Sequence, residues 1–280
     1  MKKKSETAKS KSVAHLPYTF EPGKKCRLAD FDPDPKDSSF DKEAAKERIK
    51  ENSEVIIDLA RKLYAENKQS ILLVLQGMDT SGKDGTIRTI MEGVNPQSCQ
   101  VTSFKKPSEE ELDHDFLWRV HAAVPRRGNI GIFNRSHYED VLIVRVHNLV
   151  PKSTWSLRYE QINAFEKILA DTGTVLLKCF LHIDKDTQRK RLQERIDDPE
   201  EHWKFNPFDL EERKLWNDYQ AAYEDALTNC NTSYAPWHII PSNKKSYRNL
   251  VVSNLVRQAL EDLKPEYPRS AESFAGLVVE

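Results

Sequence analysis

The chain has 280 residues, of which 31% are charged and 38% are hydrophobic, and its formal net charge is −1. This length suits one large domain with appendages or two small domains. A net charge near zero argues against a nucleic-acid-binding protein, and no apolar run is long enough to span a membrane. The four cysteines are far apart, form no C-x-x-C pair and favour a reduced cytoplasmic protein.

The N-terminal region is predicted to precede the folded domain. Residues 1–17 are basic and lack the apolar stretch of a signal peptide, so we predict a disordered tail, with a polyanion tether as the alternative. Residues 18–40 carry three prolines and should form an extended arm that lies on the domain. Apolar residues recur at helical spacing over 41–68, where Asp41 is placed to cap the first helix.

A phosphate-binding loop is predicted after the first strand. Residues 71–75 are all apolar, which favours a strand buried on both faces of a parallel sheet. Four residues then separate two glycines, and a lysine follows the second glycine, which is the spacing of such a loop. Glycine lets backbone N–H groups approach phosphate oxygens, the lysine adds positive charge, and the next helix points its N-terminus at the anion. The alternative is a turn that binds no ligand. The predicted phosphate-binding residues here are Gly77, Ser81, Gly82, Lys83, Asp84 and Gly85.

The same loop suggests a metal ion. The residue after the lysine is usually Ser or Thr and touches magnesium, but here it is Asp84, and Asp79 adds a second carboxylate. Two acids beside a polyphosphate would repel it, so we predict a divalent cation between them. Many phosphate-loop enzymes place an Asp at the end of the second central strand, where this chain has the neutral Asn134. We therefore predict magnesium, or manganese in its place, on Asp79.

Polar residues also follow two further predicted strands. Strand 99–102 ends before Lys105 and Lys106, at the edge where open α/β sheets bind ligands, although a solvated lysine pair is the alternative. Ser108 and the three glutamates after it predict the start of a helix through about His121. Strand 130–133 ends before Arg135, which should face a bound phosphate and act with Asp79 and Lys83 in catalysis.

Several histidines and acids lie just beyond that strand. Glu139 and Asp140 follow it by about one helical turn. His137 and His147 lack a third ligand at sensible spacing, so we expect hydrogen-bonding roles rather than zinc binding.

A mobile lid is predicted in the second half of the chain. Helix 155–171 and buried strand 174–183 lead to helix 186–195, where Arg191 and Arg195 share one face. A polar break at 200–207 precedes a long helix over 208–230, and we place the lid at about 186–215. The alternative is a charged surface helix with internal ion pairs, but we expect no acids opposite residues 189–191.

The chain closes with strand 237–241, helix 246–263 and a loosely held tail at 266–280. Strands that alternate with helices predict a single α/β domain over 18–265, built on a parallel central sheet flanked by helices. The loop, Arg135 and the lid cations should converge on one crevice suited to phosphoryl transfer. An ATP-dependent nucleoside monophosphate kinase would look similar. A nucleotide-binding switch is disfavoured, because residues 243–246 lack the final Asp of Asn-Lys-x-Asp.

Four separated motifs occur in the same order as in a known family, which makes the resemblance more specific than the phosphate loop alone. They are GMDTSGKDG at 77–85, FKKPS at 104–108, IGIFNRSHYEDVLIVRVH at 130–147 and RLQERIDDPEEHWKFNPFDLEER at 191–213. Together they resemble the second, phosphate-loop family of polyphosphate kinases, from about residue 18 to residue 263. The resemblance implies a P-loop kinase fold similar to thymidylate kinase, with a helical lid. It also implies magnesium-assisted transfer of the terminal phosphate of inorganic polyphosphate to a nucleotide, or the reverse.

The resemblance also suggests residue roles. Asp79 and Lys83 match the family's loop residues, and Arg135 matches the arginine after the second strand. Arg191 and Arg195 match the lid arginines and are expected to bind polyphosphate. The expected nucleotide-binding residues are Lys105, Lys106, Asn134, Arg135 and Glu139.

Because residue 139 is the acid Glu139, the chain resembles the subgroup that phosphorylates both AMP and ADP, giving ADP and ATP. Members restricted to one step often have Asn at that place. The family often forms dimers or tetramers, so we expect a homo-oligomer.

Overall fold

The structure is a computed structural model that describes residues 18–34, 40–270, 274 and 277–279. The tail predicted at 1–17 lies outside the described residues, as does part of the tail predicted at 266–280. The described residues 264–270 contain no helix or strand.

Within the described residues, one sheet of five parallel strands has the order β2-β3-β1-β4-β5. Every residue of β1 is buried, as its continuous apolar run predicted, because it lies at the centre between β3 and β4. The predicted fold class is therefore confirmed. The strands are β1 (Ser70–Gln76), β2 (Cys99–Ser103), β3 (Ile130–Asn134), β4 (Thr174–His182) and β5 (Trp237–Pro241).

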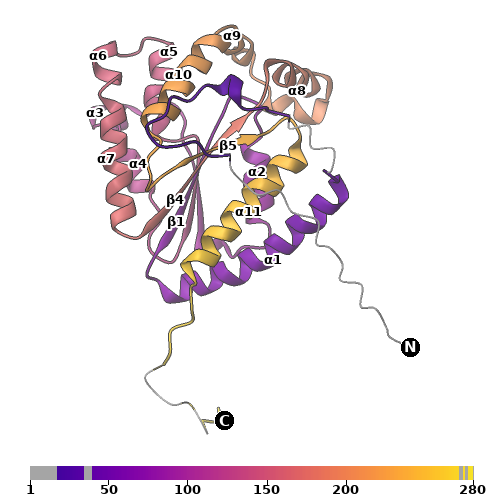
Figure 1. The fold of residues 1–280 in the computed structure, drawn as a ribbon, viewed down its shortest axis with the longest axis vertical. Helices are drawn as coiled ribbons and strands as arrows, with labels where there is room; N and C mark the ends of the chain where they lie inside the picture. The colour runs from indigo at the N-terminus through magenta and orange to yellow at the C-terminus, as the bar shows by residue number, and fades with distance from the viewer. Residues whose placement is uncertain (1–17, 35–39, 271–273, 275–276, 280) are drawn as a thin grey trace.

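Helices cover both faces of the sheet (Figure 1). On one face α1 (Lys42–Glu66) and α11 (Lys245–Leu263) run side by side over Ile71 and Leu73 of β1. On the other face α7 (Arg158–Asp171) and α10 (Trp216–Asn229) pack against Leu72. Side chains alternate along a strand, so one apolar run supplies both layers of the core.

The remaining helical segments are mostly short. They are η1 (Leu28–Asp30), α2 (Lys83–Met91), η2 (Pro96–Ser98), α3 (Glu109–Asp113), α4 (Trp118–Ala123), η3 (His137–Val141), α5 (Ile143–Val146), α6 (Lys152–Trp155), α8 (Lys185–Asp197), η4 (Pro199–Lys204) and α9 (Phe208–Lys214). No helix among the described residues is both long enough and apolar enough to cross a membrane.

Three helices expected to be continuous are each broken in two. The Ser108 cap is confirmed as a capping box with Glu111, but α3 ends at Asp113. The Asp115 side chain then accepts from the N–H of Leu117 at 2.9 Å, and this local bond competes with a continuing helix. The expected helix 155–171 divides into α6 and α7, and 208–230 divides into α9 and α10, which meet at Leu215.

The predicted N-terminal arm is confirmed over its described residues. Ile239 donates its N–H to the carbonyl of Tyr18 at 2.6 Å, and the N–H of Cys26 reaches Oγ1 of Thr228 at 2.9 Å. Leu28, at the start of η1, is buried. The arm therefore closes over α10 and the edge strand β5.

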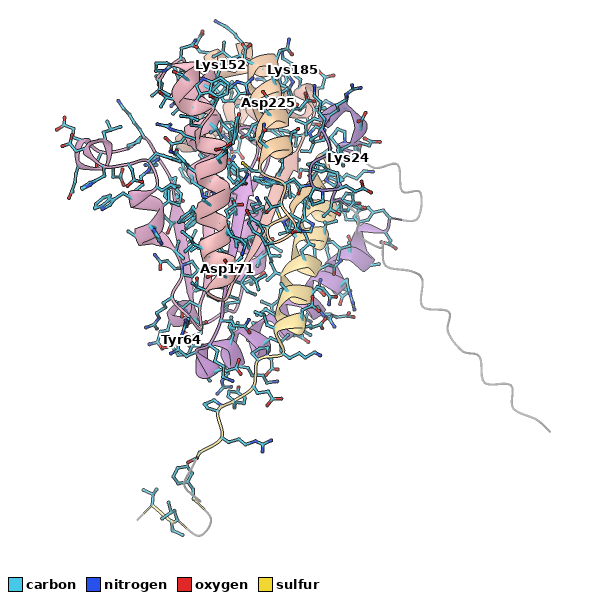
Figure 2. The ribbon with its side chains drawn as sticks, turned by 60° about the vertical axis from the view of Figure 1, so that its left-hand side comes forward. Lys24, Tyr64, Lys152, Asp171, Lys185 and Asp225 are labelled. Atoms are coloured by element: carbon cyan, nitrogen blue, oxygen red, sulfur yellow. The ribbon has the colours of Figure 1, made fainter. Side chains whose placement is uncertain are left out.

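The carboxyl ends of the strands lie at one end of the molecule. In Figure 2, Lys185 just after β4 lies near the top, whereas Asp171 just before β4 lies well below it. Loops that follow parallel strands therefore gather at the top, where α8 and α9 also lie in Figure 1.

A buried ion pair between β4 and α7 predicts a large stability effect. Nζ of Lys178 lies 2.7 Å from Glu166, and both side chains are fully buried. We expect Lys178→Met to cost about 3–5 kcal/mol in urea unfolding, because it leaves a buried carboxylate without its cation. Lys167→Met breaks the exposed pair with Asp171 and should cost only about 0–1 kcal/mol. Equal losses in the two variants would contradict this prediction.

Candidate active site

The phosphate loop joins β1 to α2 and needs both of its glycines. Gly77 and Gly82 have φ angles of 152° and 101°. A Cβ on Gly77 would lie 2.7 Å from the carbonyl oxygen of Leu181, and one on Gly82 would lie 1.8 Å from Nη1 of Arg248. Only glycine combines these backbone angles with such close neighbours. Helix α2 then starts at Lys83, directly after the second glycine.

Lys83 is held against the loop rather than in solvent. Its Nζ donates to the carbonyl of Gly77 at 2.8 Å and more weakly to that of Met78 at 3.4 Å. Burial, aided by the positive charge of Arg135, lowers the pKa of Lys83, although Asp79, Glu139 and Asp84 oppose this shift. The ammonium group is thus surrounded by the acids of the site.

Arg135 and Asp79 meet across the loop, as the sequence predicted for the ends of β1 and β3. Nη2 of Arg135 donates to Oδ1 of Asp79 at 2.9 Å. Burial tends to raise the pKa of Asp79, but the charges of Lys83 and Arg135 outweigh it and hold that pKa below its usual value. Arg135 itself adopts a left-handed backbone with φ of 60°, which is uncommon for a residue other than glycine. Strain of this kind is often retained at functional sites.

The two positions that depart from the general loop pattern contact one another. Nδ2 of Asn134 donates to Oδ1 of Asp84 at 2.6 Å. Where other phosphate-loop enzymes have a loop hydroxyl and a strand carboxylate, this chain has a loop carboxylate and a strand amide. This chain therefore has the same negative charge as those enzymes, but the carboxylate is in the loop instead of on the strand.

Glu139 lies in η3, close enough to Arg135 and Lys83 to interact with their charges. Burial raises the pKa of Glu139, although the charges of Arg135 and Lys83 act against that rise. Its negative charge in turn helps to raise the pKa of Tyr223, after burial, the larger cause. Glu139 therefore lies near the cations Lys83 and Arg135 and also near α10.

The predicted lid arginines have different surroundings. Arg195 lies 3.8 Å from Asp209, and its charge contributes to the lowered pKa of Asp79, so it lies near the loop. Arg191 is buried, and its guanidinium donates to carbonyl oxygens of Thr80, Ser242 and Asn243 at 2.8 to 2.9 Å. The first turns of α8 are thus docked on the phosphate loop.

The cations at the edge of the site are exposed to solvent. Lys105 and Lys106 are exposed at the end of β2, and neither forms an ion pair in the described part of the chain. The expected lack of acids opposite residues 189–191 is wrong at one position, because Asp186 lies 4.0 Å from Arg189. That pair is exposed and therefore weak.

His137 and His147 hydrogen-bond to carboxylates, as predicted. Nε2 of His137 lies 3.2 Å from Glu166, and Nε2 of His147 lies 3.0 Å from Glu212. Over the described residues, no group of three or more His, Cys, Asp or Glu side chains is arranged to hold a metal ion.

The donors around the loop nevertheless fit a magnesium ion shared with phosphate. Magnesium prefers oxygen ligands and usually takes one or two protein carboxylates plus substrate phosphates and water. Asp79 and Asp84 supply carboxylates from the loop. The hydroxyl of Ser81 is buried without a hydrogen-bond partner, which marks a polar position suited to an additional ligand.

Sequence reasoning missed several residues that shape the site. Gln76 is fully buried at the end of β1, donates to Ser136 at 3.0 Å and leaves its Oε1 unpartnered. Gln188 donates to the carbonyl of Asp79 at 3.3 Å. Arg248 reaches the loop from α11. The available signal was a polar residue at an apolar position, since Arg248 lies one turn before Val252 on the buried face of α11.

Comparisons with known proteins identify the family of the chain. A curated relative from Meiothermus ruber, named AMP/ADP-polyphosphate phosphotransferase, is 51% identical over 94% of this chain and 99% of its own length. A relative from Rhodopseudomonas palustris, named ADP-polyphosphate phosphotransferase, is 47% identical over 82% of this chain and 83% of its own. The crystal structure of polyphosphate kinase 2 from Arthrobacter aurescens TC1 matches with a TM-score of 0.87 at 39% identity, covering 94% of this chain and 97% of that one. The family model of polyphosphate kinase 2 matches residues 39–268, so the chain belongs to the polyphosphate kinase 2 family.

Proposed function

We propose that this protein transfers the terminal phosphate of inorganic polyphosphate to AMP and ADP, giving ADP and ATP, in a reversible reaction. The observation that carries the proposal is the convergence of the phosphate loop, Arg135 and Arg195 around Asp79. The printed names of the Meiothermus and Rhodopseudomonas relatives support polyphosphate as donor and AMP or ADP as acceptor.

The chain's own residues would act by positioning and by neutralising charge. The N–H groups of the loop at Gly82 and Gly85, with Lys83, would hold the transferring phosphate, and Arg135 would stabilise its equatorial oxygens. An acceptor phosphate oxygen would then attack in line, breaking the bond to the next phosphate and releasing the shortened polyphosphate chain. The lid would exclude water so that transfer outcompetes hydrolysis. Arg195, assisted by Arg191, would bind the polyphosphate chain.

The acceptor nucleotide is proposed to lie on the opposite side of the loop from the polyphosphate chain. Asn134 ends β3, Arg135 follows it and Glu139 lies in η3, and these residues would line that side. Lys105 and Lys106 would reach it from the end of β2. Glu139 would help to set which acceptor is used.

When bound, magnesium or manganese would neutralise the negative charge of the phosphate groups. Asp79 and Asp84 are the residues that would hold it. We expect Asp84→Asn to weaken Mn²⁺ binding by about tenfold, as for loss of an important partner in a metal site. An Asn at this position still accepts the amide of Asn134, so the change removes charge but little geometry. Electron paramagnetic resonance titration of Mn²⁺ with tripolyphosphate present would measure this, and unchanged affinity would exclude Asp84.

The first experiment mixes purified protein with magnesium, polyphosphate and AMP, without ATP, and follows nucleotides by chromatography. ADP followed by ATP supports the proposal, and ADP alone would withdraw the second step. If neither forms, while ATP plus a monophosphate gives ADP, the protein is an ordinary nucleotide kinase instead. A reaction without enzyme controls for contamination.

Glu139→Asn tests the source of the two-step activity. We expect this variant to lose one of the two steps by about tenfold or more, because a charged hydrogen-bonding partner is removed. The other step should change much less, which initial rates with AMP and with ADP would reveal. Equal losses in both steps would contradict a role in acceptor choice.

We also propose a cytoplasmic homo-oligomer, either dimer or tetramer. All four cysteines are free thiols, in keeping with a reducing compartment. Light scattering on the eluting protein would give the oligomeric state.

A further inference from the structure

The phosphate loop is held from its outer side by carbonyl contacts. The carbonyl of Asp79 accepts from Gln188, that of Thr80 accepts from Arg191, and that of Ser81 accepts from Nη1 of Arg248 at 3.0 Å. A peptide unit is planar, with its C=O and N–H pointing in opposite directions. An anchored Ser81 carbonyl therefore fixes the direction of the next N–H, that of Gly82.

That direction is important because α2 begins at this point. The first N–H groups of a helix lack partners within the helix, and here they follow Gly82. Such N–H groups, together with the helix dipole, form an anion site. By holding the carbonyl of Ser81, Arg248 thus sets the direction of the Gly82 N–H, the first N–H donor of this anion site.

The guanidinium of Arg248 is packed directly against the loop glycines. A Cβ on Gly82 would lie 1.8 Å from Nη1, and one on Gly85 would lie 3.3 Å from Nη2. The side chain is only 2% exposed, so it has no room to withdraw. The glycines therefore admit phosphate from one side and Arg248 from the other.

The charge of Arg248 has no protein counter-ion in the described part of the chain. Neither it nor the neighbouring Arg191 forms an ion pair there, and the other contacts of Arg248 are to the side-chain oxygen of Asn249. Burial and the charge of Arg191 lower the pKa of Arg248 to about 10. A buried cation is unfavourable unless it is paired, and the nearest place for an anion is the loop.

We propose that Arg248 is a positioning residue for the phosphate loop: through the carbonyl of Ser81 it holds the loop in its anion-binding conformation, and its charge is balanced by the bound polyphosphate. This inference rests on the proposed function, since it takes the polyphosphate as the loop's ligand. Arg191 supports the same loop from α8.

Calorimetric titration with tripolyphosphate and magnesium tests the proposal. We expect Arg248→Met to weaken binding by about tenfold to a hundredfold, because small displacements of positioned groups have effects of this size. Arg248→Lys keeps the charge but loses the planar guanidinium. Its affinity for tripolyphosphate should lie between those of the wild type and Arg248→Met. Arg257→Met is the matched control, because that arginine lies on the same helix and bonds Glu261 and Asn52 instead.

Kinetics and melting separate positioning from mere stability. The KM for polyphosphate should rise more than kcat falls, because the loop holds phosphate in both the ground state and the transition state. A variant that melts earlier but binds tripolyphosphate with wild-type affinity would overturn the proposal. If the wild-type protein does not bind tripolyphosphate, the proposed function itself fails. If it does, and Arg248→Met binds equally well, only the role of Arg248 is lost.

Discussion

Replacing Lys83 by Met should reduce polyphosphate-driven formation of ADP and ATP by about a hundredfold or more, the effect of losing one preorganised donor. Methionine has a similar length but no charge, so the side chain keeps its volume while the transferring phosphate loses its cation. The surrounding acids should then repel the phosphate, because Asp79, Glu139 and Asp84 all act electrostatically on Lys83.

Initial rates with AMP and with ADP, at saturating magnesium, would measure this effect. Lys167→Met is a suitable control, since that lysine is half exposed and pairs with Asp171 on α7. A melting curve should first establish that the Lys83 variant is folded. Near-normal turnover in a folded variant would remove Lys83 from the mechanism.

Replacing Arg135 by Met should have a comparable effect, again about a hundredfold. Arg135 is proposed to stabilise the phosphate, and it holds Asp79 at 2.9 Å, so its loss would remove a cation and release a carboxylate. Arg135→Lys should recover little, because a single ammonium group does not reproduce the planar guanidinium.

A double-mutant cycle with Asp79→Asn tests the link between the two residues. If they act as one unit, the double variant should lose much less than the two single losses combined. Arg145→Met is the matched control, because it also breaks an Arg–Asp pair, the 2.7 Å contact with Asp225. Fully additive losses would show that the pair has no joint role.

The sequence predicted best what depends on local pattern. The continuous apolar run at β1, the glycine spacing of the loop and the cap at Asp41 each follow from neighbouring residues, and all three agree with the structure. The alternation of strands and helices then led to the parallel sheet.

The sequence could not predict contacts made between distant segments. Arg248 reaches Ser81 across 167 positions, and Asn134 reaches Asp84 across 50, so no local period reveals either pair. Arg191 was identified as a lid cation, yet its carbonyl partners depend on how α8 docks on the loop. The helix breaks were missed because short competing bonds, such as that of Asp115, determine them.

The contact between Asp84 and Asn134 also constrains how such a site can change over time. If Asn134 became Asp first, two carboxylates would meet where an amide and a carboxylate now lie 2.6 Å apart, and one would have to take up a proton. If Asp84 changed first, to Ser or Asn, the intermediate would lack one negative charge but contain no repulsive pair. The exchange between a loop carboxylate and a strand carboxylate is therefore epistatic, and the route that begins at the loop is the more accessible one.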